Sequence, residues 1–196
     1  VTLGGKTYID GVDITPDDIY AHHDKTGELP KTSATNVGEC LDFFKKFTES
    51  GKTVIHFTIS SDMSSTYANA CLAAEELENV YVINTENLST GGGLLTVAAA
   101  QMRDDGLAAE EIVEKTKALV PCVDASFVID SLEYLYKGGR CSALAMFGAN
   151  LLRLKPCIQV KNGKMDVAKK YRGKYDEVLK QYIREKVTDY SDIDLE

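Results

Sequence analysis

Six hydroxyl or carboxyl side chains stand together near the middle of the chain, directly after a run of β-branched and aromatic residues (54–59) that is typical of a buried parallel strand. From Tyr67 onward the residues favour a helix. A turn from strand to helix presents hydroxyls and unpaired backbone N–H groups at the positive helix end, where an anion is stabilised. The sequence therefore predicts an anion-binding turn, with simple capping of the helix by Ser64 or Ser65 as the alternative. The six residues are Ser60, Ser61, Asp62, Ser64, Ser65 and Thr66.

A serine hydrolase would need a general base close to one of these hydroxyls. The turn lacks the G-x-S-x-G pattern, and the histidines are His22, His23 and His56. His56 precedes Ser60 by four positions, roughly 13 Å along an extended strand, which is beyond hydrogen-bond reach. These residues favour binding over catalysis and predict a protein that is not an enzyme. An acyl- or phosphate-transferring enzyme that uses the serine turn as its nucleophile remains the alternative.

Two glycine-containing segments resemble phosphate-binding loops only superficially. Gly91-Gly92-Gly93 precedes a predicted helix but fits neither the dinucleotide pattern nor a Walker loop, and close packing of helix on sheet explains it better. The segment 137–140 is interpreted as a helix C-terminus closed by glycine, with basic side chains on the last carbonyls. No group of residues has the spacing of metal ligands, so neither a metal nor a cofactor is expected.

Composition narrows the class of protein. The chain of 196 residues carries a net charge of −8, which argues against a general nucleic-acid binder. No stretch approaches the ~20 apolar residues of a membrane span, so no integral membrane segment is expected. The five cysteines form no C-x-x-C pair and predict free thiols in the cytoplasm. The basic segment 161–186 is interpreted as a solvated helix face, or as a docking surface for an acidic or phosphate-bearing partner.

The pattern of elements predicts an α/β fold. A hairpin, a helix beginning at Thr15-Pro16 and a helix capped by Asn36 and Glu39 come first. Strand and helix then alternate up to residue 120, as in βαβ units with a parallel sheet covered by helices on both faces. After Pro121 follow a strand, two short helices, a hairpin whose Asn162-Gly163 turn suits type I′ geometry, and a long helix. We therefore expect an N-terminal α/β domain at residues 1–122 and a smaller α/β domain at 123–196.

Several of these stretches, taken together and in order, resemble the DegV family of bacterial lipid-binding proteins over nearly the whole chain. They read YIDGVDITPDDIYAH, GELPKTSATNVGE, ISSDMSSTYANA, INTENLSTGGGLL, FVIDSLEYLYKGGRCS and KPCIQVKNGKMDVAKKYRGK. The resemblance implies a long-chain fatty acid bound between two α/β domains. It also implies that the carboxylate is presented to a separate fatty acid kinase subunit, which makes acyl phosphate for phospholipid synthesis.

The resemblance further implies which residues hold the ligand. A hydroxyl of the family's K-T-S motif and a serine of its S-S-x-x-S-x-T turn bind the carboxylate; the matching residues are Thr32, with Ser33 adjacent, and Ser64, with Ser65 adjacent. Arg172 matches a basic residue near the ligand or the kinase contact. A regulatory lipid-sensing module that docks a partner through its basic segment is a further alternative.

The chain departs from the family pattern in the turn and at its ends. Asp62 and Ser65 replace two glycines, and Asp62 is expected to point outward because an unpaired buried carboxylate beside an anion is costly. The family's opening strand and its C-terminal strand with a histidine are missing, so a chain trimmed at both ends is expected. Candidates for lining an acyl tunnel, with plain core packing as the alternative, are Met146, Phe147, Leu151 and Leu152.

Overall fold

The computed structural model describes residues 1–131, 133–140 and 154–188. The predicted second apolar helix and its four tunnel candidates (Met146, Phe147, Leu151 and Leu152) lie outside these residues. Contacts divide the chain into two compact units, Val1–Thr35 and Asn36–Glu196, and each is described by itself. The domain boundary expected at residue 122 is a different division and stays a prediction.

The first unit begins with the predicted hairpin. Strands β1 (Thr2–Leu3) and β2 (Lys6–Thr7) pair antiparallel across a Gly4-Gly5 turn in which both glycines have positive φ. Helix α1 (Pro16–Thr26) starts at the capping box of Thr15 and Asp18 and ends at Gly27, whose φ of 73° is left-handed. The helix bounds predicted from the cap, the proline and the glycine are therefore confirmed.

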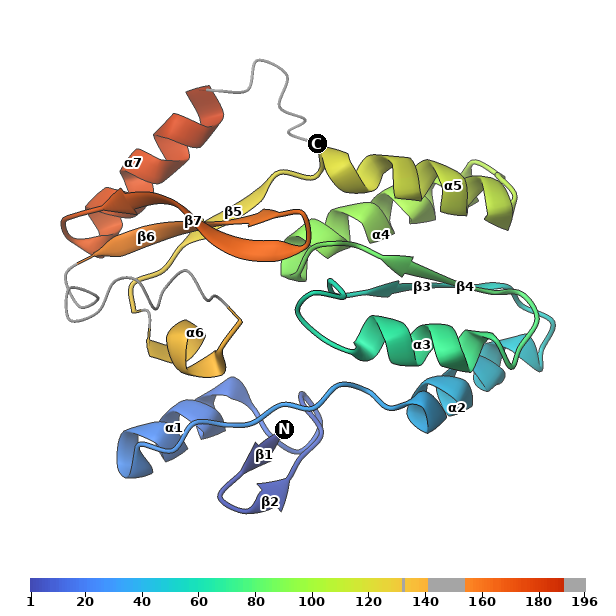
Figure 1. Cartoon of the computed structure of the whole chain (residues 1–196), viewed down its shortest axis with the longest axis horizontal. Helices are drawn as coiled ribbons and strands as arrows, with labels where there is room; N and C mark the ends of the chain where they lie inside the picture. Colours follow the sequence, from blue (N-terminus) through green and yellow to red (C-terminus); the bar gives the residue numbers. More distant parts are fainter. Residues whose placement is uncertain (132, 141–153, 189–196) are drawn as a thin grey trace. The chain divides into compact units, whose positions relative to one another are not determined.

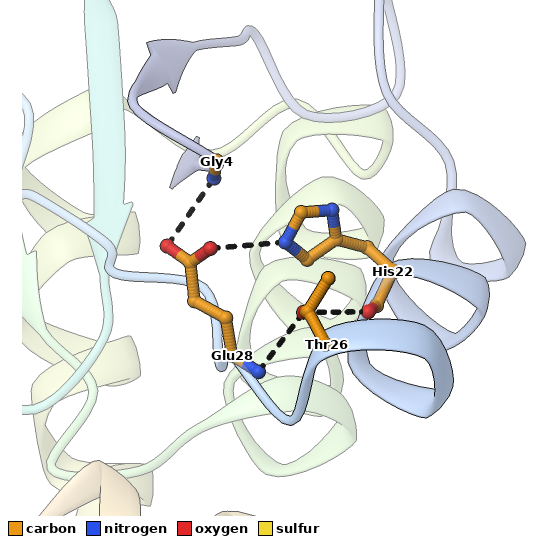
Figure 2. A network of polar contacts seen from close by, with 4 residues as sticks. All are labelled: Gly4, His22, Thr26 and Glu28. Atoms are coloured by element: carbon orange, nitrogen blue, oxygen red, sulfur yellow. Dashed lines mark hydrogen bonds and ion pairs between the residues drawn. The ribbon is translucent and has the colours of Figure 1, made fainter.

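A network of polar contacts fastens the segment after α1 to this hairpin (Figure 2). Glu28 accepts a hydrogen bond from the Gly4 N–H at 3.3 Å, and its other oxygen lies 3.0 Å from Nε2 of His22. The hydroxyl of Thr26 donates to the His22 carbonyl and accepts from the Glu28 N–H. The hydrogen bond from His22 lowers the pKa of Glu28 below its ordinary value. Two backbone hydrogen bonds between Thr2 and Lys31 add a second tie.

In the second unit, a two-stranded parallel sheet lies between two pairs of helices (Figure 1). Strand β3 (Val54–Thr58) pairs in register with β4 (Val80–Asn84). Helices α2 (Val37–Thr48) and α3 (Thr66–Ala74) pack on one face, and α4 (Ser89–Asp104) and α5 (Ala109–Leu119) pack on the other. A short 3-10 helix (Val120–Cys122) follows α5. The predicted parallel sheet with helices on both faces is confirmed.

Local sequence explains where these helices begin and what they bury. Asn36 and Glu39 form the predicted capping box at the start of α2, with both hydrogen bonds at 2.9 Å. Phe44 is fully buried in a cluster between α2, α3 and the sheet, and the His56 ring packs against it in a T-shaped arrangement with 5.1 Å between centroids. Burial lowers the pKa of His56, as expected for a packed strand residue.

The three consecutive glycines lie inside the first turns of α4, which begins at Ser89, and not before the helix as predicted. Gly91 is buried, and a Cβ atom built on it would lie 2.1 Å from Oδ1 of Asn87. Its lack of a side chain lets Asn87 pack against the helix. This supports the packing interpretation for Gly91, here against a side chain at the sheet edge, whereas a Cβ atom built on Gly93 has no heavy atom within 4 Å.

The second unit also contains an antiparallel sheet of three strands in the order β5-β6-β7. These strands are β5 (Ala125–Val128), β6 (Lys155–Lys161) and β7 (Lys164–Tyr171). Asn162 and Gly163 have φ values of 50° and 76°, as a type I′ turn requires, so the predicted turn is confirmed. Helix α7 (Tyr175–Thr188) packs on one face of this sheet through Val178.

The short helix α6 (Glu133–Gly138) ends as the sequence indicates. Gly139 has a left-handed φ of 72°, and Nη1 of Arg140 donates to the Gly138 carbonyl at 2.6 Å. The interpretation of this segment as a closed helix C-terminus is confirmed. The thiols of Cys40, Cys71, Cys122 and Cys157 are free, while Cys141 lies outside the described residues.

Candidate functional site

The serine turn joins the end of β3 to the start of α3 and is organised by Ser60. This residue is fully buried, and its N–H donates to the Asn87 carbonyl at 2.9 Å. The Ser60 carbonyl accepts the N–H groups of Met63 and Ser64 at 3.0 and 3.2 Å. These hydrogen bonds close the backbone of the turn on itself and fix where Ser64 lies.

A distant hairpin holds the same turn from the other side. The Ser60 hydroxyl donates to the carbonyl of Gly163, in the turn between β6 and β7, at 2.7 Å. Met63 is buried in a cluster with Ile158, Val160 and Met165 of that hairpin. The serine turn is therefore packed against the antiparallel sheet and is not a free loop.

The predicted capping of α3 involves both Ser64 and Ser65: one occupies the N-cap position and the other accepts the hydrogen bond. Ser65 occupies the N-cap position of α3, as predicted, but its side chain makes no capping hydrogen bond and is exposed. The half-buried Ser64 hydroxyl accepts the Thr66 N–H at 3.2 Å and lies 2.9 Å from the Thr66 hydroxyl. The positive end of α3 thus carries an exposed hydroxyl beside a pair of linked ones.

Sequence reasoning missed the second half of this sheet edge, which follows β4. Thr85 and Asn87 are buried there, and the Thr85 hydroxyl donates to the Thr58 carbonyl at 2.8 Å. The side-chain oxygen of Asn84 accepts from the backbone of Ser61, while its amide donates to the Ser61 hydroxyl. The signal was available, because the carboxyl ends of parallel strands meet at one edge, where α/β proteins bind ligands.

Two cavities lie beside this edge. One of about 240 Å³ is lined by the ends of β3 and β4 and the first turns of α4, including Thr58, Thr85 and Asn87. A second of about 740 Å³ runs from Asn87 and Ser89 to apolar side chains of α4, β5 and β6, among them Leu94, Phe127 and Val160. Its size falls in the range of small-molecule pockets.

Thr32 and Ser33 lie in the other unit, so their placement is described separately. Both are exposed, and they directly follow Lys31, whose backbone hydrogen bonds tie the segment to Thr2. The Thr32 and Ser33 hydroxyls therefore follow directly after a backbone position that is hydrogen-bonded to Thr2. A joint site with Ser64 and Ser65 stays a prediction.

Arg172 is exposed and follows the end of β7. The Gly163 turn that touches Ser60 lies at the opposite end of this eight-residue strand, roughly 25 Å away at the usual rise. Within the second unit, Arg172 therefore stands far from the serine turn. Its role at the ligand or at a partner stays a prediction.

Asp62 points outward, as expected. Its side chain is 44% exposed, and Oδ1 lies 3.5 Å from Nζ of Lys164. The described residues contain no group of three His, Cys, Asp or Glu side chains placed to hold a metal ion. Within the same residues, no helix is both long and apolar enough to cross a membrane.

Fold and site together define an α/β protein with a hydroxyl-rich turn at the carboxyl edge of a parallel sheet. The family model described as the uncharacterised DegV family matches residues 1–192, and the chain belongs to this family. A DegV domain-containing protein of Clostridium acetobutylicum is 35% identical over 88% of this chain and 63% of its own length. One from Caldanaerobacter subterraneus is 32% identical over 88% of this chain and 62% of its own length. The chain thus spans less than two thirds of these relatives.

Solved structures agree with the fold. A Thermus thermophilus DegV family protein, described by its fatty acid binding, superposes with a TM-score of 0.82 at 28% identity and covers 93% of this chain and 66% of its own. A stearic acid-binding protein from Eubacterium ventriosum gives a TM-score of 0.79 at 32% identity over 95% of this chain and 68% of its own. The mixed α/β fold is therefore that of DegV proteins, some of which bind fatty acids.

Proposed function

We propose that this protein binds a long-chain fatty acid in the cytoplasm and carries out no chemistry on it. The hydroxyls of Thr32, Ser33, Ser64 and Ser65 donate hydrogen bonds to the carboxylate. The observation that carries the proposal is the serine turn: its backbone is held by Ser60, and it presents hydroxyls at the N-terminus of α3. The relatives described as binding fatty acids support the same ligand.

The apolar tail supplies most of the affinity in this proposal, at about 0.8 kcal/mol per buried CH₂. The cavity of about 740 Å³ beside the sheet edge offers apolar side chains for part of it. The hydroxyls fix where the head group sits, since each hydrogen bond to a charged group contributes about 1.5–3 kcal/mol.

Presentation to a separate fatty acid kinase subunit, for phospholipid synthesis, completes the proposal. Arg172 is exposed and stands about a strand length from the serine turn, as a residue for partner contact would. Exchanging Lys170 and Arg172 for glutamate should then abolish kinase binding and leave fatty-acid uptake intact; Lys169 is kept because it pairs with Glu185 of α7. Loss of fatty-acid uptake in this variant would place the basic residues at the ligand instead.

Lipid extraction of the purified protein, followed by mass spectrometry, tests the central claim. We expect a long-chain acyl species, and Ser64→Ala should weaken palmitate binding about 10- to 100-fold, because a hydrogen bond to the carboxylate is lost. Ser50→Ala, which alters an exposed serine at the end of α2, is the matched control. The proposal fails if no acyl species is found and none is taken up. Turnover by the isolated protein that Ser64→Ala abolishes would support an enzyme instead.

A further inference from the structure

The serine turn carries a negative charge of its own, two residues before Ser64. Asp62 is exposed, and its carboxylate lies on the solvent side of the turn at which an anionic head group would bind. Like charges repel over several ångströms even in water, by about 0.6 kcal/mol at a separation of 7 Å. An unpaired Asp62 would therefore work against a carboxylate at this turn.

The hairpin between β6 and β7 supplies the opposite charge at this position. Lys164 follows the hairpin turn directly, and its ammonium nitrogen lies 3.5 Å from the Asp62 carboxylate. The Asp62 side chain also lies against the turn glycine, since a Cβ atom built on Gly163 would be 3.0 Å from Asp62 Oδ2 and 2.7 Å from Ser60 Oγ. Only glycine at this left-handed position lets the hairpin approach the serine turn so closely.

Moving Lys164 away from the serine turn would require the hairpin between β6 and β7 to break buried contacts. The buried hydrogen bond from Ser60 to Gly163 joins residues 103 positions apart, and Met63 is buried among hairpin residues. Lys164 is thus held near Asp62 by contacts that do not depend on the ion pair, which by itself contributes little at an exposed site.

We propose that Lys164 is a specificity-determining residue of the serine turn: it neutralises Asp62, so that the turn accepts an anionic ligand and not merely an apolar one. The inference rests on the proposed fatty-acid site and deepens it. Lys164 acts through Asp62 and makes no contact of its own with the head group. Removing the lysine alone should therefore harm binding, while removing both charges together should not.

Binding of radiolabelled palmitate and of uncharged hexadecanol to the full chain distinguishes these cases. Lys164→Met should weaken palmitate binding about 3-fold, as expected of one uncompensated charge nearby, and leave hexadecanol binding unchanged. Lys164→Arg and the double variant Asp62→Asn with Lys164→Met should both bind palmitate like the unmodified protein. The loss in Lys164→Met should shrink in 1 M salt, where the Debye length is about 3 Å. Lys174→Met, an exposed lysine beyond the far end of β7, is the matched control.

Each result has one meaning. If Lys164→Met weakens palmitate and hexadecanol equally, or changes neither, the inference is wrong while the proposed function stands. If the double variant stays weak, Lys164 binds the head group directly and the inference is also wrong. If the unmodified protein binds neither ligand, the proposed function fails and takes this inference with it.

Discussion

Gly91 and Gly93 lie two positions apart in α4 but have different surroundings. A Cβ atom on Gly91 would lie 2.1 Å from the side-chain oxygen of Asn87, whereas no heavy atom lies within 4 Å of one on Gly93. Asn87 cannot simply turn aside, because it is buried and its oxygen accepts the Leu88 N–H at 3.0 Å. The same substitution should therefore have opposite effects at the two sites.

Gly91→Ala should destabilise the protein by about 1–3 kcal/mol through this overlap. Gly93→Ala should stabilise it by roughly 0.5–1 kcal/mol, because alanine loses less conformational entropy than glycine in a helix. Urea unfolding of both variants measures the difference. Equal effects of the two substitutions would show that Asn87 does not occupy the position seen in the structure.

Helix α7 is fastened to β7 by the Glu185 carboxylate, which accepts hydrogen bonds from two side chains of β7 and from one of its own helix. Glu185 accepts hydrogen bonds from Lys169 at 2.8 Å, from the Tyr171 hydroxyl at 2.5 Å and from Gln181 at 2.9 Å. These three hydrogen bonds lower the pKa of Glu185 from 4.5 to about 2, and the bond from Lys169 has the largest effect. Burial, together with the hydrogen bond to Glu185, raises the pKa of Tyr171. The contact between helix and sheet is thus linked to protonation.

The depressed pKa of Glu185 gives a defined dependence of stability on pH. Between pH 4.5 and about 2 the unfolded chain binds more protons at this residue than the folded chain, so stability is lost as the pH falls. Glu185→Gln should flatten the decline in this window and lower stability at pH 7. Thermal unfolding from pH 7 to pH 2 measures this, with Glu177→Gln, an exposed acid in the first turn of α7, as control. Parallel curves for Glu185→Gln and the unmodified protein would contradict it.

At the scale of the two units, the large apolar clusters formed by the described residues lie in the second unit. The buried residues of the three described clusters run from Cys40 to Val178, whereas Leu3 and Ile14 are buried in the first unit. Stability follows buried apolar area, so we expect the second unit to fold by itself.

A chain of residues 36–196 should therefore unfold cooperatively, within about 3 °C of the complete chain. It should also lose palmitate retention, because the proposed ligands Thr32 and Ser33 are gone. Calorimetry and lipid extraction check the two halves of this prediction independently. A broad, non-cooperative transition would show that the second unit depends on the first, and retained palmitate would remove Thr32 and Ser33 from the site.

The amino-acid sequence alone determined the features set by near neighbours. The capping boxes at Thr15 and Asn36, the helix end at Gly27 and the type I′ turn at Gly163 each follow from residues a few positions apart. Their hydrogen bonds need only local backbone geometry, so residue type and spacing suffice to predict them. The serine turn and its two flanking elements were also evident from the sequence, because hydropathy changes sharply there.

Only the tertiary structure decided what touches that turn. The hydrogen bond from Ser60 to Gly163 and the pairing of Asp62 with Lys164 each depend on how separate elements dock. No local pattern encodes such contacts, because they form only when a long loop closes and buried apolar surface offsets its entropy. The position of Arg172, a strand length from the turn, likewise follows from the sheet and not from the spacing of residues.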